Sequence, residues 1–412
     1  MFCDVHVHLC KSVNKCSNTF RSYATTAYKN DIFKAVVFPY PLPLKSIDKI
    51  KEANRYIMEA FKNHMELFVP FFLITNDELR FIEIDKIMGF KEHFTLDPPR
   101  EDFFFPAYDF LQDNGLFLMI HPGSAKKLSP ERLTDLKIKK VENIKKNFPR
   151  LKIILAHSGR NLPFHAQGVK EVVLGLRRYE DVYFDTSTIR CPKAIEEMVE
   201  IVGSDRILFG SDYPYHKIAG EDIYSLEKDT ILKADISDAE KDDIFRKNFT
   251  RLFLKKVWVR RVCNEDVAKI LFLIDTLPEL DRKHLAITRK MDKIKRCIEK
   301  QNHMYILENK EDKIIGFIRV SERHNNGALI EEIVVAPDAR GRGLGRILME
   351  VVTNKYSYVE AKTFVENTSI NRLNEKMGFK VEKKSTKGNI LYWKKERFGS
   401  EGDFNAQENV KA

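Results

Sequence analysis

The chain has 412 residues, of which 43% are hydrophobic, and a formal net charge of +10. This length predicts two or three domains, and the apolar content excludes a disordered protein. Every apolar run is shorter than the roughly 20 residues of a membrane span, so we expect no membrane association.

The positive charge comes from dispersed doublets such as Lys139-Lys140 and Lys255-Lys256, which a solvated surface explains. No basic stripe interleaved with aromatic residues indicates a specific nucleic-acid partner, and the charge favours anionic ligands over polycationic ones. We expect small-molecule substrates. The six cysteines form no Cys-x-x-Cys pair, which is typical of a reducing, cytoplasmic compartment. The sequence leaves open whether the chain is a monomer or a homo-oligomer.

The first predicted strand, Phe2–His8, carries Asp4, His6 and His8 at alternate positions. Side chains on a strand alternate with a period of two, so both imidazoles lie on one face. Such a pair is half of a site for zinc or a similar divalent metal. The alternative is a buried strand whose histidines are satisfied by hydrogen bonds. Because the motif stands at the N-terminus, we expect no signal peptide.

Seven more strands are predicted up to residue 212, with amphipathic helices such as Ser46–Asn63 and Pro130–Asn147 between several of them. These strands are Lys34–Pro39, Leu67–Ile74, Met88–His93, Leu116–His121, Lys152–His157, Val182–Ser187 and Ile207–Asp212. Strand–helix–strand repetition indicates a parallel sheet with right-handed crossovers. Eight strands in about 250 residues predict an α/β domain, a (β/α)8 TIM barrel over residues 1–255.

Four predicted strands end in a side chain that can bind a metal: His8, His121, His157 and Asp212. The C-terminal strand ends of a TIM barrel surround its active site, so the barrel would bring these distant residues together. A single histidine at a strand end is usually structural, but four strands that each end in a ligand type are much harder to explain by chance.

This pattern resembles the amidohydrolase superfamily, in particular its branch similar to aminocarboxymuconate-semialdehyde decarboxylase. The matching motifs are Asp4-x-His6-x-His8, Leu118-Met-Ile-His121, Ile154-Leu-Ala-His157-Ser-Gly159, Leu208-Phe-Gly-Ser-Asp212-Tyr-Pro214, Lys34–Pro39 and Asn248–Phe253. The resemblance implies that His6, His8, His121 and Asp212 hold one divalent metal. It also implies that His157 lies beside the metal and contacts bound water or substrate.

The chemistry of these residue types fits metal-dependent hydrolysis of a small amide, ester or lactone. Zinc with an open coordination position lowers the pKa of bound water towards about 7. Asp212 can accept the water proton, and His157 can polarise a carbonyl or protonate a leaving group. Asp4 is expected to support a ligand or to pack the strand. The same branch includes decarboxylases, so non-hydrolytic decarboxylation is the alternative.

Three basic residues bear on the substrate. Gly89-Phe-Lys91-Glu-His93 resembles the Gly-x-Lys-x-His segment at strand four of this branch, and we expect Lys91 to face the substrate. The alternatives are a carbamylated lysine that bridges two metals, as in binuclear relatives, and a surface lysine. Arg160 and Arg190 follow the sixth and seventh strands, where each either meets a substrate carboxylate or forms a surface ion pair.

A second domain is predicted over residues 256–396 with a short connection to the first, followed by a disordered tail over 397–412. Its predicted elements are strand Val257–Val262, helices Asp266–Ile274 and Lys283–Lys300, strands Met304–Glu308, Ile314–Ser321 and Leu329–Val335, and a helix to about residue 354. The glycine-rich turn Pro337–Gly345 joins the last strand to the last helix. Converging N–H groups at such a turn can hold a phosphate, although a tight turn is the plain alternative.

The spacing Arg340-x-x-Gly343-x-Gly345 resembles the acetyl-CoA motif of the α+β GNAT N-acetyltransferases. Ile314–Phe317, Glu332–Pro337, Asn367 and Glu375–Phe379 support the resemblance. It implies that the loop holds the pyrophosphate of acetyl-CoA and that strand residues contact its pantetheine. The implied cofactor residues are Val334, Val335, Arg340, Gly341, Arg342, Gly343, Gly345, Arg346 and Asn367.

Glu332 or Glu331 is a candidate base for the acceptor amine, and a solvent-facing strand position is the alternative. Asn374 stands where many GNAT enzymes have a tyrosine that protonates the leaving thiolate, and an amide cannot supply that proton. We therefore predict a bifunctional enzyme, a metal-dependent hydrolase joined to an N-acetyltransferase. In the alternative, the second domain senses acyl-CoA without catalysis.

Overall fold

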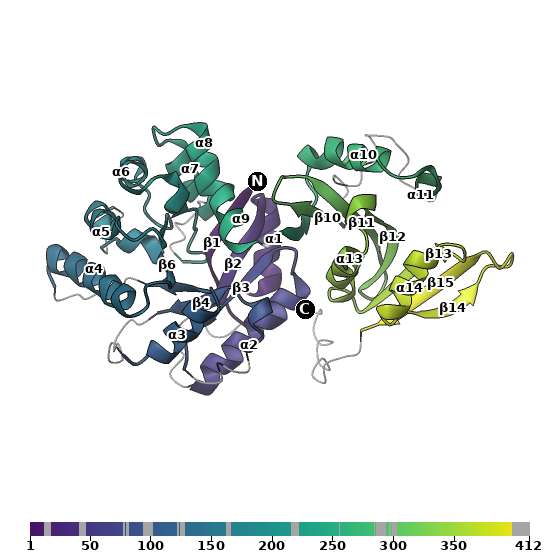
Figure 1. Ribbon diagram of the computed structural model, residues 1–412, viewed down its shortest axis with the longest axis horizontal. Coiled ribbons are helices and arrows are strands. Elements are labelled where there is room, and N and C mark those ends of the chain that lie inside the picture. Colours follow the sequence, from purple (N-terminus) through teal and green to yellow (C-terminus); the bar gives the residue numbers. More distant parts are fainter. Residues whose placement is uncertain are drawn as a thin grey trace, which may run out of the picture. The chain divides into compact units, whose positions relative to one another are not determined.

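The computed structural model describes residues 1–11, 18–40, 47–76, 79, 82–93, 102–121, 123, 128–161, 166–215, 222–254, 256–283, 285, 294–295, 298 and 303–397. The chain divides into two compact units, Met1–Lys255 and Lys256–Ala412 (Figure 1). The predicted tail after Arg397 and most of the helix predicted over Lys283–Lys300 lie outside the described residues. No helix in the described ranges has the length and apolar composition that a membrane span requires.

The first unit is a parallel barrel of eight strands that follow one another in sequence order. The strands are β1 (Phe2–Leu9), β2 (Ile32–Pro39), β3 (Phe68–Leu73), β4 (Gly89–Glu92), β5 (Phe117–Ile120), β6 (Lys152–Leu155), β7 (Val182–Asp185) and β8 (Ile207–Leu208). The predicted TIM-like fold is confirmed, and all eight predicted strands are present.

The ring is completed by the segment that follows β8. Val5 N–H donates to Phe209 O at 2.9 Å and His8 N–H donates to Tyr213 O at 2.8 Å, so β1 is bonded to residues beyond the last strand. β8 itself has two residues, although Ile207–Asp212 was predicted to be strand throughout. The strand ends early because the chain bends away, and Asp212 adopts a left-handed φ of 58°.

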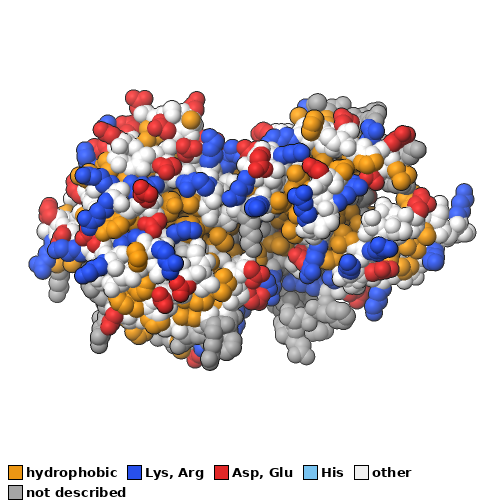
Figure 2. Space-filling view, viewed as in Figure 1, with side chains coloured by type: hydrophobic (Ala, Val, Ile, Leu, Met, Phe, Trp, Pro, Cys, Tyr) orange, Lys and Arg blue, Asp and Glu red, His pale blue; other side chains and the backbone are white. Residues whose placement is uncertain are grey.

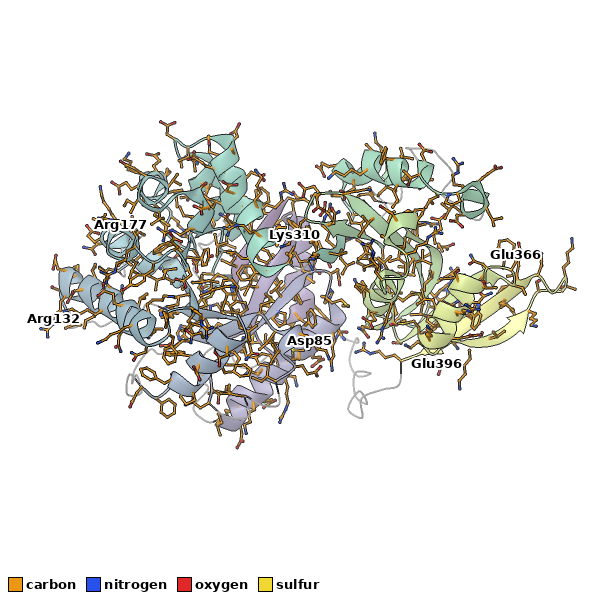
Figure 3. The ribbon with its side chains drawn as sticks, in the orientation of Figure 1. Asp85, Arg132, Arg177, Lys310, Glu366 and Glu396 are labelled. Carbon is orange, nitrogen blue, oxygen red and sulfur yellow. The ribbon has the colours of Figure 1, made fainter. Side chains whose placement is uncertain are left out.

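Helices on the outside of the barrel lie between several of the successive strands, and within the described residues three more follow β8 (Figure 1). They are α1 (Phe20–Lys29), α2 (Ile47–Asn63), α3 (Phe105–Asp113), α4 (Pro130–Asn147), α5 (Val169–Leu176), α6 (Pro192–Val202), α7 (Ile223–Leu232), α8 (Asp238–Asp242) and α9 (Asn248–Phe253). The start of α4 follows from its sequence, because Ser129 caps the N–H of Arg132 and Pro130 occupies the first turn. Arg132 and Arg177 extend outward from these helices (Figure 3).

The second unit is a mixed sheet of seven strands in the order β14-β15-β13-β12-β11-β10-β9. The strands are β9 (Val257–Arg261), β10 (Met304–Asn309), β11 (Ile314–Arg323), β12 (Gly327–Val335), β13 (Tyr358–Phe364), β14 (Lys380–Lys384) and β15 (Ile390–Glu396). Its helices are α10 (Val267–Asp275), α11 (Glu279–Lys283), α13 (Leu344–Thr353) and α14 (Thr368–Lys376). The predicted α+β class is confirmed.

One strand of this sheet has two differently paired edges. β12 pairs with antiparallel β11 along its length, from Gly327 to Val335. With parallel β13 it pairs only from Gly327 to Ile330. The backbone of residues 331–335 is therefore released from β13, immediately before the glycine-rich turn.

The surface carries both signs of charge. Figure 2 shows Lys and Arg side chains interspersed with Asp and Glu over the face in view, without a single-sign stripe on that face. This distribution agrees with the solvated lysine doublets inferred from the sequence.

Candidate active sites

The loops after β6, β7 and β8 hold several residues in a strained backbone conformation. The non-glycine residues with positive φ in these loops are His157 (55°), Ser158 (46°), Thr188 (62°), Arg190 (40°) and Asp212 (58°). Left-handed backbone costs roughly 1–2 kcal/mol for each such residue. It persists where surrounding contacts enforce it, and it concentrates at functional sites. The strain therefore marks the C-terminal mouth of the barrel between β6 and β8.

A buried lysine from α4 holds the loop after β6. Lys137 Nζ donates to Gly159 O at 2.9 Å, to Arg160 O at 2.8 Å and to Asn161 Oδ1 at 2.6 Å. Burial lowers the pKa of Lys137 to about 8. Three oxygen acceptors around one ammonium fix the loop that carries His157.

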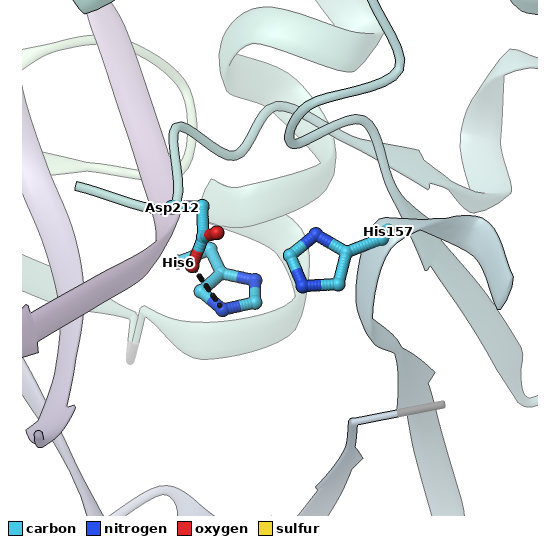
Figure 4. Close-up of side chains that lie close together, drawn as sticks. All are labelled: His6, His157 and Asp212. Carbon is cyan, nitrogen blue, oxygen red and sulfur yellow. Dashed lines mark ion pairs between the residues drawn. The ribbon is translucent and has the colours of Figure 1, made fainter. Parts of the chain in front are cut away.

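His6, His157 and Asp212 meet at the centre of this mouth (Figure 4). One ligand atom from each lies within 4.8 Å of the others, and all three side chains are buried. His6 Nε2 is 3.2 Å from Asp212 Oδ1 but makes no hydrogen bond among the described residues. Two nitrogens and a carboxylate oxygen suit zinc or a similar divalent cation. The buried Nε2 of His6, which has no hydrogen-bond partner among the described residues, is suited to bind an ion together with His157 and Asp212.

Asp185, at the end of β7, orients two of these side chains. His6 Nδ1 lies 2.8 Å from Asp185 Oδ2, so the carboxylate accepts that N–H and leaves Nε2 with its lone pair. His157 Nδ1 lies 2.8 Å from Ser187 Oγ, and this hydroxyl donates to Asp185 Oδ1. His157 N–H also donates to Asp185 Oδ1 at 3.0 Å. A carboxylate that accepts the other ring N–H of a metal-binding histidine fixes the tautomer of the imidazole and raises its basicity.

Sequence reasoning missed Asp185 as a site residue. The available signal was that Asp185 directly follows the apolar residues Val182–Phe184, although the predicted strand ran on to Ser187 and hid its place at a strand end. Asp4 was expected to support a ligand or to pack the strand. It accepts hydrogen bonds from Ser211 Oγ at 2.6 Å and Tyr224 Oη at 2.7 Å, which pack β1 against the segment after β8.

His8 joins the central group through Asp212, whereas His121 stands beside it. His8 Nε2 is 3.2 Å from Asp212 Oδ1. The ring of His121 lies 5.3 Å from that of His157 and 4.2 Å from that of His93. His121 Nδ1 accepts from Gly123 N–H at 3.0 Å. The group whose ligand atoms all lie within 4.8 Å of one another holds His6, His157 and Asp212, and His121 of the predicted metal set is not part of it.

Lys91 lies inside the barrel among these histidines and is fully buried. Its Nζ lies 5.0 Å from the centroid of the Phe38 ring, and it has no hydrogen-bond partner within the described part of the chain. Burial lowers the pKa of Lys91 to about 8, against the opposing effect of Asp185 and Asp212. A surface role is wrong for this lysine, because no part of it is exposed.

Aromatic side chains that sequence reasoning did not single out line the mouth around His8. The ring of His8 lies 4.6 Å from Phe38, 6.0 Å from Tyr40 and 4.9 Å from Tyr215, measured between centroids. Tyr40 stacks on Tyr215 at 4.8 Å. These contacts place an apolar wall next to the polar centre, the usual composition of a small-molecule site.

Burial of the histidines predicts a loss of stability in acid. The pKa values of His6, His8, His121 and His157 lie well below the usual 6.5, with burial as the largest cause. Below about pH 6.5 the unfolded chain takes up protons at these imidazoles and the folded chain does not, so stability falls as the pH falls. Each histidine contributes a slope of at most about 1.4 kcal/mol per pH unit.

Urea unfolding of the metal-free protein between about pH 7 and pH 5 measures this dependence. A His157→Gln variant removes one of the four groups and should show a shallower slope. A free energy of unfolding that stays constant over this range in the wild type would contradict the expectation.

In the second unit, Gly341 and Gly343 both have φ of 77°, and a Cβ added at either would meet no atom within 4 Å. The turn therefore has open space beside Gly341 and Gly343, and it stands directly before α13, where the N–H groups of a helix start can hold an anion. Gly345 differs, because a Cβ there would approach Leu373 Cδ2 of α14 to 3.1 Å. Gly341 and Gly343 thus fit a phosphate cradle, and Gly345 fits close packing of α13 on α14.

The other predicted cofactor residues are engaged within the chain. Arg340 donates to Val335 O at 3.1 Å and to Asp281 at 2.6 Å, and Arg346 pairs with Glu350 at 2.8 Å. Arg342 donates to Asp338 O at 3.0 Å. Asn367 caps α14 by accepting from Ile370 N–H at 3.4 Å. Val334 and Val335 lie on the part of β12 that has separated from β13.

Glu332 and Asn374 are both buried. Glu332 pairs with Arg319 at 3.0 Å, so it must leave an ion pair before it can act as a base. Glu331 is exposed and accepts from Ser321 Oγ at 2.7 Å. Asn374 is 1% exposed, and neither of its amide atoms has a hydrogen-bond partner in the described ranges. A buried amide without partners is costly, which is consistent with an unfilled ligand contact.

Two family models match separate parts of the chain. Residues 3–254 match the model described as amidohydrolase, and residues 300–381 match the acetyltransferase (GNAT) domain. The uncharacterized N-acetyltransferase ycf52 of Porphyra purpurea is 25% identical over 153 residues, which cover 36% of this chain and 82% of that protein.

Relatives of the chain also include a 2-keto-4-carboxy-3-hexenedioate hydratase from Sphingobium sp., 27% identical over 183 residues. The match covers 39% of this chain and about half of the hydratase, 53% of its length. The crystal structure of 2,6-dihydroxybenzoate decarboxylase from Rhizobium is similar with a TM-score of 0.50 and 15% identity, covering 61% of this chain and 98% of that one. This likeness shows the barrel fold alone.

Proposed function

Because the chain belongs to the amidohydrolase family, whose model matches residues 3–254, we propose that its barrel is a metal-dependent hydrolase. The proposed substrate is a small amide, ester or lactone. The observation that carries the proposal is the buried meeting of His6, His157 and Asp212 within 4.8 Å. We propose that the second unit uses acetyl-CoA to acetylate an amine.

The barrel residues divide the proposed work among them. His6, His8 and Asp212 would hold the metal, completed by His121 or His157. When bound, zinc or a similar divalent ion supplies Lewis acidity and lowers the pKa of water. Asp212 would accept the proton, and His157 would donate to the substrate oxygen or leaving group. Asp185 keeps His6 and His157 oriented, and Lys91 would face the substrate.

The open edge of β12 supports the proposal for the second unit. β13 pairs with β12 only as far as Ile330, so the backbone of residues 331–335 does not pair with β13, which suits a pantetheine chain that hydrogen-bonds as a strand does. The glycine turn follows directly and suits the pyrophosphate. Glu332 or Glu331 would serve as base once an acceptor amine is bound.

A second candidate is non-hydrolytic decarboxylation in the barrel combined with acyl-CoA sensing in the second unit. The likeness of the barrel fold to a decarboxylase is compatible with the first part. Buried Asn374 favours the second part, because its amide can bind a thioester or thiol but cannot protonate a thiolate.

Product analysis separates the candidates. The metal-loaded protein is incubated with a panel of amides, esters, lactones and carboxylic acids, with acetyl-CoA and amines assayed in parallel. Hydrolysis gives a new carboxylate without CO2, and decarboxylation releases CO2. Thioester consumption that requires an amine supports transfer, whereas binding without consumption supports sensing. Turnover that survives complete metal removal would contradict the metal-dependent proposal for the barrel.

A further inference from the structure

Arg160 is a buried cation that makes no ion pair with any described residue, although the charges of Asp212 and Glu227 raise its pKa against the larger, opposing effect of burial. The side chain is 4% exposed and follows the short turn Ala156–Gly159 after β6. Its Nε donates to Thr188 Oγ1 at 2.7 Å. Its Nη1 is buried without any hydrogen-bond partner among the residues described, and the guanidinium makes no ion pair with them. Buried charges in proteins are normally paired, so this guanidinium has capacity for an external anion.

The neighbouring carboxylates contact other side chains than Arg160. Glu227 accepts from Arg190 Nε at 3.0 Å and from Thr188 N–H at 2.9 Å. Asp185 is bonded to His6, and Asp212 lies against His6 and His8. The sequence had left Arg160 and Arg190 as equal candidates for a carboxylate. The structure distinguishes them, because Arg190 pairs with Glu227, whereas the Nη1 of Arg160 has no partner in the part of the chain that the structure describes.

The position of Arg160 connects it to the catalytic mouth. Thr188 Oγ1, which accepts from Arg160 Nε, is 3.2 Å from His157 Nδ1, so one hydroxyl separates the guanidinium from that imidazole. Lys137 bonds the carbonyls of Gly159 and Arg160 and thereby fixes the backbone beneath the side chain. The guanidinium is therefore held in place before a ligand arrives, which reduces the entropy lost on binding.

We propose that Arg160 binds a carboxylate group of the barrel substrate, which is therefore a small organic acid. A planar guanidinium offers parallel N–H donors that match the two oxygens of a carboxylate. This inference rests on the proposed enzymatic function of the barrel and names its substrate class. Arg160 recognises and positions the substrate, while the bond-breaking chemistry belongs to His157 and Asp212.

The test measures thermal unfolding of the full-length protein in acetate and in chloride at equal ionic strength. Acetate is the probe because it is the smallest stable carboxylate with a methyl group in place of the rest of a substrate. At about ten times its Kd, acetate should shift the wild-type unfolding equilibrium roughly tenfold. Arg160→Met should lose this acetate-specific shift. Arg178→Met, which removes an exposed arginine of the same unit, should retain it.

Metal content is measured on the same samples, so that acetate held by a metal is not mistaken for acetate held by Arg160. Loss of the acetate shift in Arg160→Met at unchanged metal content supports the inference. An equal shift in wild type and Arg160→Met, or no shift in wild type, overturns it. If Arg160→Met does not fold, Arg160→Gln replaces it, because glutamine removes the charge and keeps a donor for Thr188.

The two proposals fail separately in this experiment. A protein without metal that still shows an Arg160-dependent acetate shift would refute the metal-dependent function and leave the carboxylate site standing. A metal-loaded protein whose acetate shift does not depend on Arg160 would leave the metal site standing and refute the carboxylate assignment.

Discussion

His6→Ala and Asp212→Ala should each lower the affinity of the purified protein for a divalent metal by at least about 100-fold. Loss of a residue that merely supports a metal ligand costs 10–100-fold, and loss of a ligand should cost at least as much. Both residues belong to the predicted metal set and to the group within 4.8 Å. The wild type should bind about one ion per chain by elemental analysis, as expected for a single group of donors.

His64→Ala is the matched control for removing a histidine from the barrel unit. His64 is buried, lies 3.2 Å from Glu66 and precedes β3, at the end of the barrel opposite the strand ends that carry the site. Metal retained at wild-type affinity in both His6→Ala and Asp212→Ala would refute the site. Comparison of His121→Ala with His157→Ala then identifies the third imidazole, for which the resemblance implies His121 and the distances favour His157.

Asp212→Asn adds a further distinction between binding and chemistry. The amide keeps an oxygen donor, so metal affinity should fall less than in Asp212→Ala. It cannot accept a proton, so turnover should fall more steeply than metal occupancy. Equal losses of metal and turnover would mean that Asp212 acts as a ligand without serving as the base.

Gly343→Asp should weaken acetyl-CoA binding to the second unit by at least about 100-fold. Gly343 precedes α13, where the helix dipole and free N–H groups favour an anion. An aspartate there places a carboxylate next to the expected pyrophosphate and fills the open space beside the turn. Isothermal calorimetry with acetyl-CoA measures the change.

Gly388→Asp controls for the backbone cost of this substitution. Gly388 also has a positive φ, 71°, and open space at the position of a Cβ, but it lies between β14 and β15, away from the glycine turn. The Gly388→Asp protein should therefore bind acetyl-CoA as the wild type does. Unchanged affinity in a folded Gly343→Asp protein would refute the cradle.

The sequence predicted most of the barrel because buried parallel strands are continuous apolar runs. It also placed His8, His121, His157 and Asp212 at strand ends, since each follows such a run directly. The strand boundaries were less accurate, because His157 and Asp212, which were predicted to end the sixth and eighth strands, lie beyond β6 and β8 in strained turns that apolar content does not reveal. The prediction that His6 and His8 lie on one face of a strand required only the side-chain period of two.

The supporting contacts could not be predicted from the sequence. Asp185 lies 179 residues from His6, and nothing local shows that their side chains meet at 2.8 Å. The sequence predicts that Lys137 is an exposed charged residue of an amphipathic helix, but its side chain is only 4% exposed and lies beneath the loop after β6. The ion pair of Arg190 depends on Glu227 of α7, which lies 37 residues away in the sequence, so sequence alone could not separate Arg190 from Arg160.

The five residues that follow β8, residues 209–213, both close the barrel and supply a site residue. Phe209 and Tyr213 accept hydrogen bonds from β1 that close the barrel. Asp212 lies between them in the sequence, and its carboxylate contacts His6. A metal that ties Asp212 to His6 would also tie the last strand to the first. Ion binding should thus stabilise the closure of the barrel between β1 and the segment after β8. An insertion within residues 209–213 would disrupt these closing hydrogen bonds and displace the ligand Asp212 at the same time.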